Sequence, residues 1–445
     1  MTKIGFVSLG CSKNLVDTEV MLHHLAMAGY EITAEAEEAD VIVLNTCGFI
    51  ESAKNESIEN ILDLAWLKEN GKLKGLICTG CLAERYREEI MKEMPEVDAL
   101  LGVGSLSAIT DAVKAVERGE KFTCFDDKET APLGGDRVLT TPEYTAYLKV
   151  GEGCDNKCTY CAIPLIRGRF RSRPIEDIVK EAKDLEALGV KELNLIAQDT
   201  TRYGLDLYGE YRLADLVRAI CAETEIPWVR LLYCYPDKIT DDLVKELRDN
   251  PRLLPYMDVP VQHIADGVLA RMNRHGDGAT VRDAIARLRR EVPGITLRTT
   301  AMVGFPGETE EDFTELCAFV KETRFDRFGA FTFSPEEGTA AAEMEGQIDE
   351  DVKAKRYETL MAIQLDISAE LQREKVGETL TVLCEGFDPV AETHFGRSAA
   401  DAPDVDGKIY FSAPRRVEAG TFVSVKITEA LDYDLIGELV SQNDN

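Results

Sequence analysis

The chain has 445 residues, of which 44% are hydrophobic and 30% charged, and its formal net charge is −30. This length is too great for one ordinary hydrophobic core, so about three domains are expected. The negative charge argues against a simple nucleic-acid-binding protein, because contacts with phosphates need clustered Lys and Arg, and it suits a basic protein partner.

The N-terminus shows no sign of export or membrane insertion. No apolar run approaches the roughly 20 residues that a membrane span needs. The stretch MTKIGFVSLG is too short, and lacks the small-residue cleavage site, for a secretory signal. It is typical of a first β-strand, and we expect a cytoplasmic protein without a membrane partner.

Residues 1–120 alternate short apolar runs with helical patterns, which predicts an open α/β sheet. The apolar runs suit buried parallel strands and occupy residues 3–9, 41–47 and 73–80. The helical patterns between them occupy residues 12–30 and 50–70. Cys11, Cys47 and Cys81 each follow a predicted strand, and the binding loops of such a sheet lie there.

Residues 121–144 show no sustained period, and we expect a linker that holds a hairpin at most. Residues 145–375 form a second unit, in which six strand-like runs alternate with helical ones before a long connecting helix. Six such units predict a βα barrel, whole or partial and TIM-like. The six runs are AYLKVGEG, ELNLIAQD, WVRLLYCYP, MDVPVQH, ITLRTTAMVGFPG and RFGAFTFSP.

Residues 376–445 change to short strands separated by turns, which predicts a small all-β barrel. The strand-like runs are TLTVLCEGF, GKIYFSA, TFVSVKITEA and DLIGELV. The expected fold class is therefore α/β multidomain: an open α/β sheet, a central partial βα barrel and a C-terminal β-barrel.

Three of the twelve cysteines gather in the stretch GEGCDNKCTYCAIPLIRG. Disulfides are not expected in a reducing compartment, so metal or cluster ligation is the first interpretation. Cys154, Cys158 and Cys161 could belong to a zinc site, but structural zinc takes four ligands and no histidine is close in sequence. A four-iron cluster held by three cysteines would leave one iron open for an exchangeable ligand.

The order Cys-x3-Cys-x2-Cys, with Tyr160 before the last cysteine, resembles the signature of radical S-adenosylmethionine enzymes. The resemblance implies that Cys154, Cys158 and Cys161 hold a catalytic 4Fe-4S cluster whose open iron binds S-adenosylmethionine. An electron from a reductase, or from a flavodoxin- or ferredoxin-type donor, would cleave that cofactor to a 5′-deoxyadenosyl radical. Three unliganded cysteines packed by chance are the alternative.

Sequences around the other cysteines resemble the methylthiotransferases of this superfamily. LGCSKNLVDTE, NTCGFIESAKNES and TGCLAERY are similar to their N-terminal domain, and the final barrel is similar to their TRAM domain. The resemblance thus covers nearly the whole chain. It implies that Cys11, Cys47 and Cys81 hold a second 4Fe-4S cluster with one open iron, which delivers the sulfur.

The first trio has other interpretations. Cysteine is commonly buried as a small hydrophobe, and Cys78 with Cys81 could be a thioredoxin-like redox pair. Because Cys78 falls inside an apolar run and Cys81 after it, we assign Cys78 to the core and Cys81 to the cluster. The remaining cysteines are expected to be mostly buried: Cys124, Cys221, Cys234, Cys317 and Cys384.

Four arginines follow the central cysteines at every second position: Arg167, Arg169, Arg171 and Arg173. In an extended segment they would share one face. They could hold a carboxylate of the methionine group or of the substrate, and Arg167 is the candidate for cofactor binding. A solvated edge strand protected by charge is the alternative.

Further cofactor-binding candidates follow predicted strands. Tyr160 belongs to the cysteine motif, and Gln198 with Asp199 ends a strand where cofactor hydroxyl or amino groups could be held. Gly304 and Gly307 lie before an acid-capped helix, where the backbone could approach a cofactor closely.

Two branches of the methylthiotransferases differ in substrate: one modifies an adenosine in tRNA, the other the β-carbon of an aspartate in ribosomal protein uS12. CSKNLVDTE, CGFIESAKNES and GRSAADAPDVDGKIYF resemble the ribosomal branch, because the RNA enzymes usually show Gln-Met-Asn after the first cysteine. The resemblance implies uS12, free or in the small subunit, as partner, with tRNA as the alternative substrate.

The charge of the last domain favours the same branch. Residues 376–445 contain 5 basic and 13 acidic side chains, a net of 5 − 13 = −8, and a barrel that grips RNA should be basic. We therefore expect no stable RNA binding by this barrel, whose acidity suits a basic ribosomal protein. A non-catalytic iron–sulfur or zinc protein that binds ribosomal particles is the alternative of another class.

Overall fold

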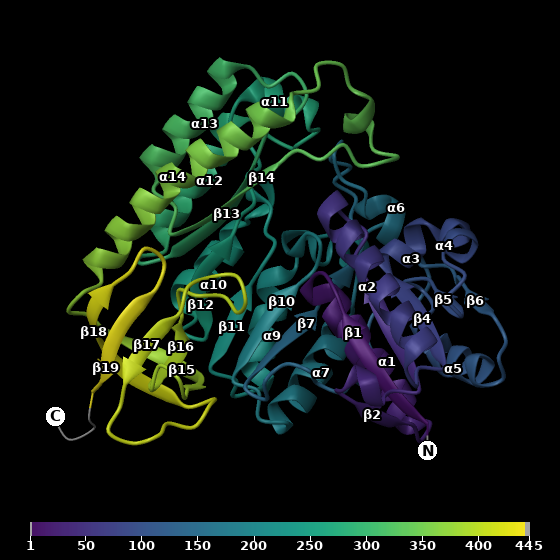
Figure 1. Ribbon diagram of the computed structural model, residues 1–445. Helices are drawn as coiled ribbons and strands as arrows, with labels where there is room; N and C mark the ends of the chain where they lie inside the picture. The colour runs from purple at the N-terminus through teal and green to yellow at the C-terminus, as the bar shows by residue number, and fades with distance from the viewer. Residues whose placement is uncertain (1, 441–445) are drawn as a thin grey trace.

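The computed structural model describes residues 2–440. The N-terminal part is a six-stranded parallel sheet of order β2-β1-β3-β4-β5-β6, coloured purple to blue in Figure 1. Its strands are β1 (Lys3–Ser8), β2 (Glu31–Thr33), β3 (Val41–Thr46), β4 (Gly75–Gly80), β5 (Ala99–Leu101) and β6 (Phe122–Cys124). The open α/β sheet expected here is confirmed.

Helices cover both faces of this sheet, which is why β3 and β4 are buried at every position. One face packs on α1 (Ser12–Met27) and α5 (Ile109–Glu117). The other packs on α2 (Glu51–Asn70), α3 (Cys81–Arg85) and α4 (Arg87–Glu93). Strand β6 lies in the segment expected to be a linker. It pairs with β5 in parallel, so no hairpin forms there.

The central part is a second six-stranded parallel sheet, of order β14-β13-β12-β11-β10-β7, which stays open. Its strands are β7 (Thr145–Lys149), β10 (Glu192–Ile196), β11 (Trp228–Leu231), β12 (Leu253–Asp258), β13 (Thr296–Val303) and β14 (Arg327–Thr332). The partial βα barrel is confirmed. The strand predicted at MDVPVQH exists but was misplaced: β12 begins earlier, at Leu253, and ends at Asp258 before Pro260, so only the first two residues of the run belong to it.

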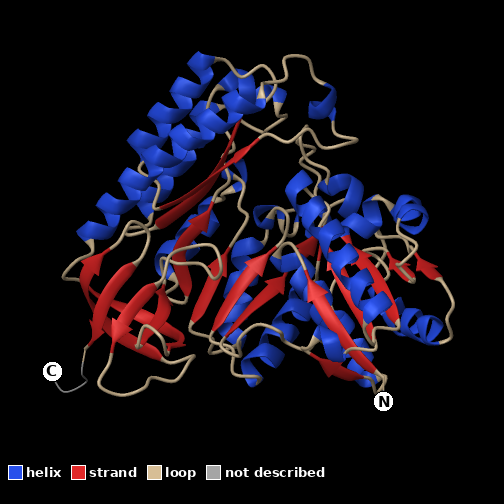
Figure 2. Cartoon of the chain, viewed as in Figure 1, coloured by secondary structure: helices blue, strands red, loops and turns tan. Residues whose placement is uncertain are grey.

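Helices pack on one face of the central sheet, as Figure 2 shows in blue. They are α7 (Ile175–Ala187), α9 (Leu213–Glu223), α10 (Asp241–Asp249), α12 (Gly278–Glu291), α13 (Glu310–Thr323) and α14 (Glu350–Glu374). Shorter helices occupy the loops: α6 (Ile163–Arg167), α8 (Leu205–Tyr208) and α11 (Asp266–Arg271). A small antiparallel pair joins β8 (Gly151–Glu152) to β9 (Arg171–Ser172).

The C-terminal part is a closed five-stranded barrel, coloured yellow in Figure 1. Its strands are β15 (Thr379–Asp388), β16 (Thr393–Ser398), β17 (Ile409–Ser412), β18 (Phe422–Ala430) and β19 (Leu435–Leu439). The predicted barrel is confirmed, but β16 was not among the predicted strands. This strand, THFGRS, is polar and contains glycine, so it carries little strand signal.

The barrel docks on the sheet face that the helices leave free. Glu192 of β10 lies between two arginines, Arg397 of the barrel at 2.5 Å and Arg230 of β11 at 3.0 Å. The barrel residue Asp406 contacts Arg298 of β13 at 2.6 Å. These ion pairs and the apolar cluster around them join the barrel to the central domain.

None of the helices in residues 2–440 combines the length and the apolar character needed to cross a membrane.

Candidate active site at the junction of two domains

The central cysteine trio lies on the loop between β8 and α6. The loop is held by backbone hydrogen bonds, from Cys154 N to Gly168 O at 3.1 Å and from Cys161 N to Cys158 O at 3.1 Å. Burial raises the pKa of Cys154 to about 11 and also raises the pKa of Cys161, and the neighbouring thiols add to both shifts. These thiols need a nearby positive charge, such as that of a metal centre, to ionise.

Two donors approach the sulfur of Cys158. The Tyr235 hydroxyl lies 3.0 Å from Sγ. The Arg274 guanidinium stacks 4.0 Å above the Tyr235 ring and brings Nη1 within 4.0 Å of the same sulfur. Both side chains can donate to a thiolate ligand, so this sulfur is the best supported of the central trio.

The N-terminal trio is assembled at the carboxyl ends of three neighbouring strands. Cys11 follows β1, Cys47 follows β3 and Cys81 begins α3 directly after β4. The parallel pairings β1–β3 and β3–β4 align these ends along one edge of the sheet. Burial raises the pKa of Cys81 to about 12, and charge on Cys11 and Cys47 contributes. The three thiols are therefore neighbours, as the strand positions predicted.

Glycines allow these three loops to meet. A Cβ on Gly10, whose φ is +87°, would lie 2.9 Å from Cys47 Cβ, and one on Gly48 would lie 2.7 Å from Leu82 N. Larger residues would force the loops apart. This role was not predicted, although each cysteine of the trio stands next to a glycine in the sequence. Cys78 is fully buried inside β4, which agrees with its assignment to the core.

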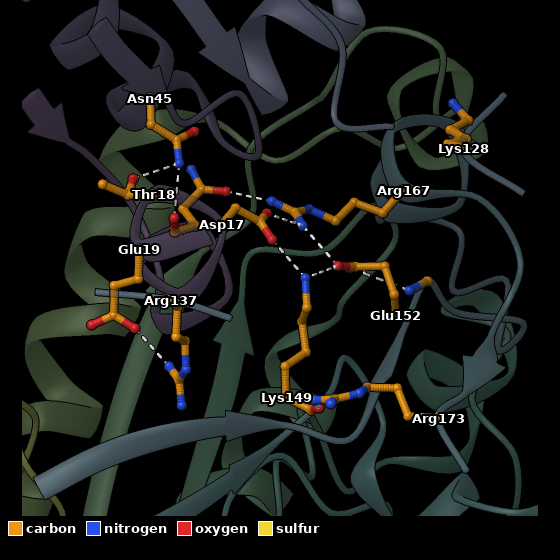
Figure 3. A network of polar contacts seen from close by, with 12 residues as sticks. Asp17, Thr18, Glu19, Asn45, Lys128, Arg137, Lys149, Glu152, Arg167 and Arg173 are labelled. Atoms are coloured by element: carbon orange, nitrogen blue, oxygen red, sulfur yellow. Dashed lines mark hydrogen bonds and ion pairs between the residues drawn. The ribbon is translucent and has the colours of Figure 1, made fainter. Parts of the chain in front are cut away.

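A buried ionic network links the N-terminal and central domains beside Cys81 (Figure 3). The Arg167 guanidinium contacts Asp17 at 2.8 Å and Glu152 at 3.0 Å, and the ammonium of Lys149 contacts the same two carboxylates at 2.6 and 2.9 Å. Arg167 Nη2 also lies 3.5 Å from Cys81 Sγ. Although burial opposes it, the two cations lower the pKa of Glu152. The network holds two positive and two negative charges, so it is neutral as a whole.

The loops of the two trios are also in direct contact. Cys81 packs in one apolar cluster with Ala162, the neighbour of Cys161 in the sequence, and with Ile166. Asn14, one turn into α1, accepts a hydrogen bond from Arg167 and faces Cys81. The network residues Asp17, Lys149 and Glu152 were not candidates in the sequence. The only signal was a pair of charges, at Lys149 and Glu152, in an otherwise apolar strand region.

The expectation that four arginines share one face was wrong. Arg167 ends helix α6, and Gly168, with φ +75°, turns the chain before β9. The Arg169 side chain is 83% exposed. Arg171 donates to the carbonyls of Ala131 and Lys128, whereas Arg173 pairs with Glu181 at 2.7 Å. The spacing of two residues did not place the arginines on one face, because the segment is not extended throughout.

The other candidates lie around the central loop. Gln198 donates to Glu152 at 2.5 Å, and Asp199 accepts from Asn156 at 2.7 Å. Tyr160 packs edge-on against Phe305, with ring centroids 6.4 Å apart.

The two glycines before α13 both have left-handed backbones, with φ +73° at Gly304 and +75° at Gly307. A Cβ on Gly304 would lie 2.3 Å from Lys353 Cγ, so packing against α14 is one reason for glycine there. The predicted acid-capped helix is confirmed by a capping box between Thr309 and Asp312.

The donor set fits an iron–sulfur cluster better than a single ion. Each trio consists of cysteines alone, and soft thiolates are the usual ligands of such clusters. Within residues 2–440 no three His, Cys, Asp or Glu side chains lie as close together as a single metal ion requires. Cysteines that bind different irons of one cluster are spaced more widely than ligands of one ion.

Three family models match the chain in order. They are the uncharacterized protein family UPF0004 over residues 3–102, the radical SAM superfamily over residues 148–320 and the TRAM domain over residues 376–440. The radical SAM match implies a 4Fe-4S cluster and S-adenosylmethionine as cofactors. It covers the loop with Cys154, Cys158 and Cys161.

Solved structures share the fold at low sequence identity. The radical S-adenosylmethionine methyltransferase TsrM from Kitasatospora setae matches with a TM-score of 0.54 and 14% identity, over 87% of this chain and 79% of its own. The cobalamin-dependent S-adenosylmethionine radical enzyme OxsB matches with a TM-score of 0.51 and 14% identity, over 81% of this chain and 56% of its own. These matches support the arrangement of the α/β parts.

Curated relatives match at much higher identity. The ribosomal protein uS12 methylthiotransferase RimO of Desulforamulus reducens is 50% identical over 99% of this chain and 100% of its own length. The protein of the same name from Thermoanaerobacter sp. is 48% identical over 98% of this chain and 100% of its own length. The chain therefore belongs to the RimO family of radical S-adenosylmethionine methylthiotransferases.

Proposed function

We propose that this chain transfers a methylthio group to ribosomal protein uS12, at the β-carbon of an aspartate. Its relatives are named for transfer to that protein, and the motif resemblance implies the aspartate. The observation that carries the proposal is the contact between the two cysteine loops, made by Cys81, Ala162 and Ile166. A reaction that needs a carbon radical and a sulfur donor at one substrate atom requires such proximity.

The six cysteines divide into two roles in this proposal. Cys154, Cys158 and Cys161 hold the cluster that binds S-adenosylmethionine, and the other three, Cys11, Cys47 and Cys81, hold a second cluster for sulfur. When bound, the first cluster and its cofactor supply the radical chemistry. The contact between the two loops keeps the two sets of thiols close to each other. Tyr235 and Arg274 donate to Cys158.

The remaining site residues have separate parts. Tyr160, Gln198 and Gly304 are the proposed contacts of S-adenosylmethionine around the central loop. Arg167 has its guanidinium on Asp17 and Glu152, so we assign it to the Cys81 side of the junction and not to the methionine carboxylate. A reductase, or a flavodoxin- or ferredoxin-type protein, would supply the electron.

The charge of the barrel supports a basic protein partner, although less strongly than composition alone indicates. Asp401 and Asp406 of the barrel pair with Arg327 and Arg298 of the central domain, so they hold the domains together. Among residues 376–440 the exposed acidic side chains still outnumber the exposed basic ones. The acids are Glu378, Glu392, Asp404, Glu418, Glu429, Asp432 and Glu438, and the bases are Lys408, Arg415, Arg416 and Lys426.

A competition experiment tests the proposed function. The reconstituted enzyme, reductant, sulfide and S-adenosylmethionine are incubated without oxygen with both uS12 and undermodified tRNA. We expect mass spectrometry to find the methylthio group on an aspartyl peptide of uS12 alone. A methylthiolated adenosine without a modified peptide would contradict the proposal and support the tRNA alternative.

A further inference from the structure

Lys13 is a buried cation without a carboxylate partner in residues 2–440. Only 5% of its surface is exposed, and its ammonium makes no ion pair or hydrogen bond within that part of the chain. The other lysines of similar burial are all paired. Lys149 contacts Asp17 and Glu152, Lys353 contacts Glu350, and Lys238 contacts Asp237. Burying a charge without a partner costs free energy unless a ligand supplies the opposite charge.

An aromatic ring holds the ammonium in place. Lys13 Nζ lies 3.0 Å from the centroid of the Tyr233 ring, which is a cation–π contact. Tyr233 follows β11 in a left-handed conformation, with φ 61°, and its backbone N donates to Asp258 Oδ2 at 3.0 Å. Such a backbone for a tyrosine is strained and points to a functional constraint.

Asp258 interacts electrostatically with Lys13, and one of its two carboxylate oxygens has no hydrogen-bond partner in residues 2–440. Asp258 accepts the Tyr233 backbone hydrogen bond, and its other oxygen lies 3.7 Å from Arg298 Nε. It makes no ion pair with Lys13 at 4.0 Å or less within residues 2–440. Asp258 therefore lowers the cost of burying the cation without forming an ion pair with it.

Lys13 and the ring beneath it belong to segments that adjoin the two cysteine trios. It stands two residues after Cys11, in the first turn of α1. The ring below it belongs to Tyr233, two residues before Tyr235, whose hydroxyl touches Cys158 Sγ. The Lys13–Tyr233 contact therefore joins the segment that follows Cys11 to the segment that contacts Cys158.

We propose that Lys13 binds the side-chain carboxylate of the target aspartate and so selects an acidic protein substrate. The inference rests on the proposed function. A carboxylate supplies the missing counter-charge, and because the β-carbon is bonded directly to that carboxyl group, the same contact brings this carbon to the segments that adjoin the trios.

Paired peptides test the contact directly. Fluorescent peptides that carry the uS12 target sequence with either Asp or Asn at the modified position are titrated against the reconstituted enzyme with S-adenosylmethionine. We expect the wild type to bind the Asp peptide about 30-fold or more tightly than the Asn peptide, since a buried charge pair is at stake. K13M should lose this preference with unchanged Asn-peptide binding, and K13R should keep part of it.

Two further variants separate charge placement from general effects. Y233L removes the ring and should reduce the Asp preference while Lys13 remains. K72M removes an exposed lysine of the same domain and should change nothing. Iron content and the visible spectrum should match the wild type in each variant, because none of these residues is a cysteine ligand.

The outcomes distinguish the two proposals. If the wild type methylthiolates the Asp peptide but K13M keeps the full Asp-over-Asn preference, the role of Lys13 is wrong and the proposed function stands. If the wild type leaves the peptide and uS12 unmodified while it modifies tRNA, the proposed function fails and this inference fails with it.

Discussion

The two cysteine trios reach similar surroundings by different routes. The central trio lies on one loop between β8 and α6, whereas the N-terminal trio is collected from the ends of β1, β3 and β4. In both, an arginine approaches one sulfur: Arg274 lies 4.0 Å from Cys158 and Arg167 lies 3.5 Å from Cys81.

The electrostatics of the two arginines differ. Arg167 is paired with Asp17 and Glu152 in a neutral network. Arg274 instead stacks on Tyr235 and donates to the carbonyl of Pro260 at 2.5 Å, without an ion pair in residues 2–440. The arginine beside the central trio therefore has no carboxylate partner in residues 2–440, whereas nearby carboxylates offset the arginine beside Cys81. We therefore expect Arg274 to affect the reduction potential of the central cluster, and Arg167 to stabilise the junction of the two domains.

The largest expected effect separates the roles of the trios. Cys158→Ala should abolish the formation of 5′-deoxyadenosine, because the cleavage site loses a ligand. Cys47→Ala should retain that cleavage and lose methylthio transfer. Each variant should fall from about eight irons per chain to about four if two clusters are present. Loss of cleavage in both variants would mean that the trios are not independent sites.

Removing Arg167 should weaken the junction most among the single ionic changes. Arg167→Met leaves Asp17 and Glu152 with Lys149 as their shared cation, and a broken buried network costs about 3–5 kcal/mol. We expect earlier thermal unfolding and faster proteolysis between the first two domains. Arg169→Met, at a side chain that is 83% exposed, is the matched control and should be neutral. Equal behaviour of the two variants would contradict the fastening role.

Removing Arg274 should act on the reduction potential. Loss of an uncompensated charge near Cys158 disfavours the reduced, more negative cluster, so the central potential should fall by on the order of 100 mV in Arg274→Met. The N-terminal cluster should hardly change. Redox titration followed by electron paramagnetic resonance measures both, and a larger shift at the N-terminal cluster would reverse the comparison.

A smaller shift is expected from the Tyr235 hydroxyl. Tyr235→Phe keeps the ring under Arg274 and removes one hydrogen bond to Cys158. One such bond is worth about 1 kcal/mol, or about 40 mV for one electron. The same titration should show a decrease of that size at the central cluster alone. No shift would mean that the hydroxyl does not donate to the ligand sulfur.

The smallest effect is expected from pH near neutrality. The folded-state pKa of Glu152 is lowered by Arg167 and Lys149, although burial opposes this. Its contribution to stability is therefore present above the ordinary glutamate pKa of about 4.3 and is lost as pH falls through the folded value. The temperature of thermal unfolding should be unchanged between about pH 6 and 8 and should decrease below about pH 4. A decrease in the unfolding temperature already near pH 6 would mean that a titratable group other than Glu152 is responsible.

Much of the fold could be predicted because hydrophobic period is a local property. The apolar runs of β1, β3 and β4 and the strands of the central sheet were visible, apart from the start of β12. Strand β16 escaped because THFGRS is polar. Strand β6 escaped because three residues carry too little pattern to distinguish a strand from a linker.

Some residues of the site could likewise be predicted from the sequence, and others could not. The sequence by itself determined the compact central trio, because its three cysteines share one loop and their spacing is visible in eight residues. It also indicated Cys11, Cys47 and Cys81, since parallel strands bring their carboxyl ends to one edge.

Only the tertiary structure decided which charged side chains lie near these thiols. Arg167, Asp17 and Lys149 come from α6, α1 and β7, and their pairing depends on how two domains pack. Lys13 was likewise not a candidate in the sequence, because its partner, the Tyr233 ring, lies far along the chain. Burial and pairing are long-range properties, and a local sequence pattern does not contain them.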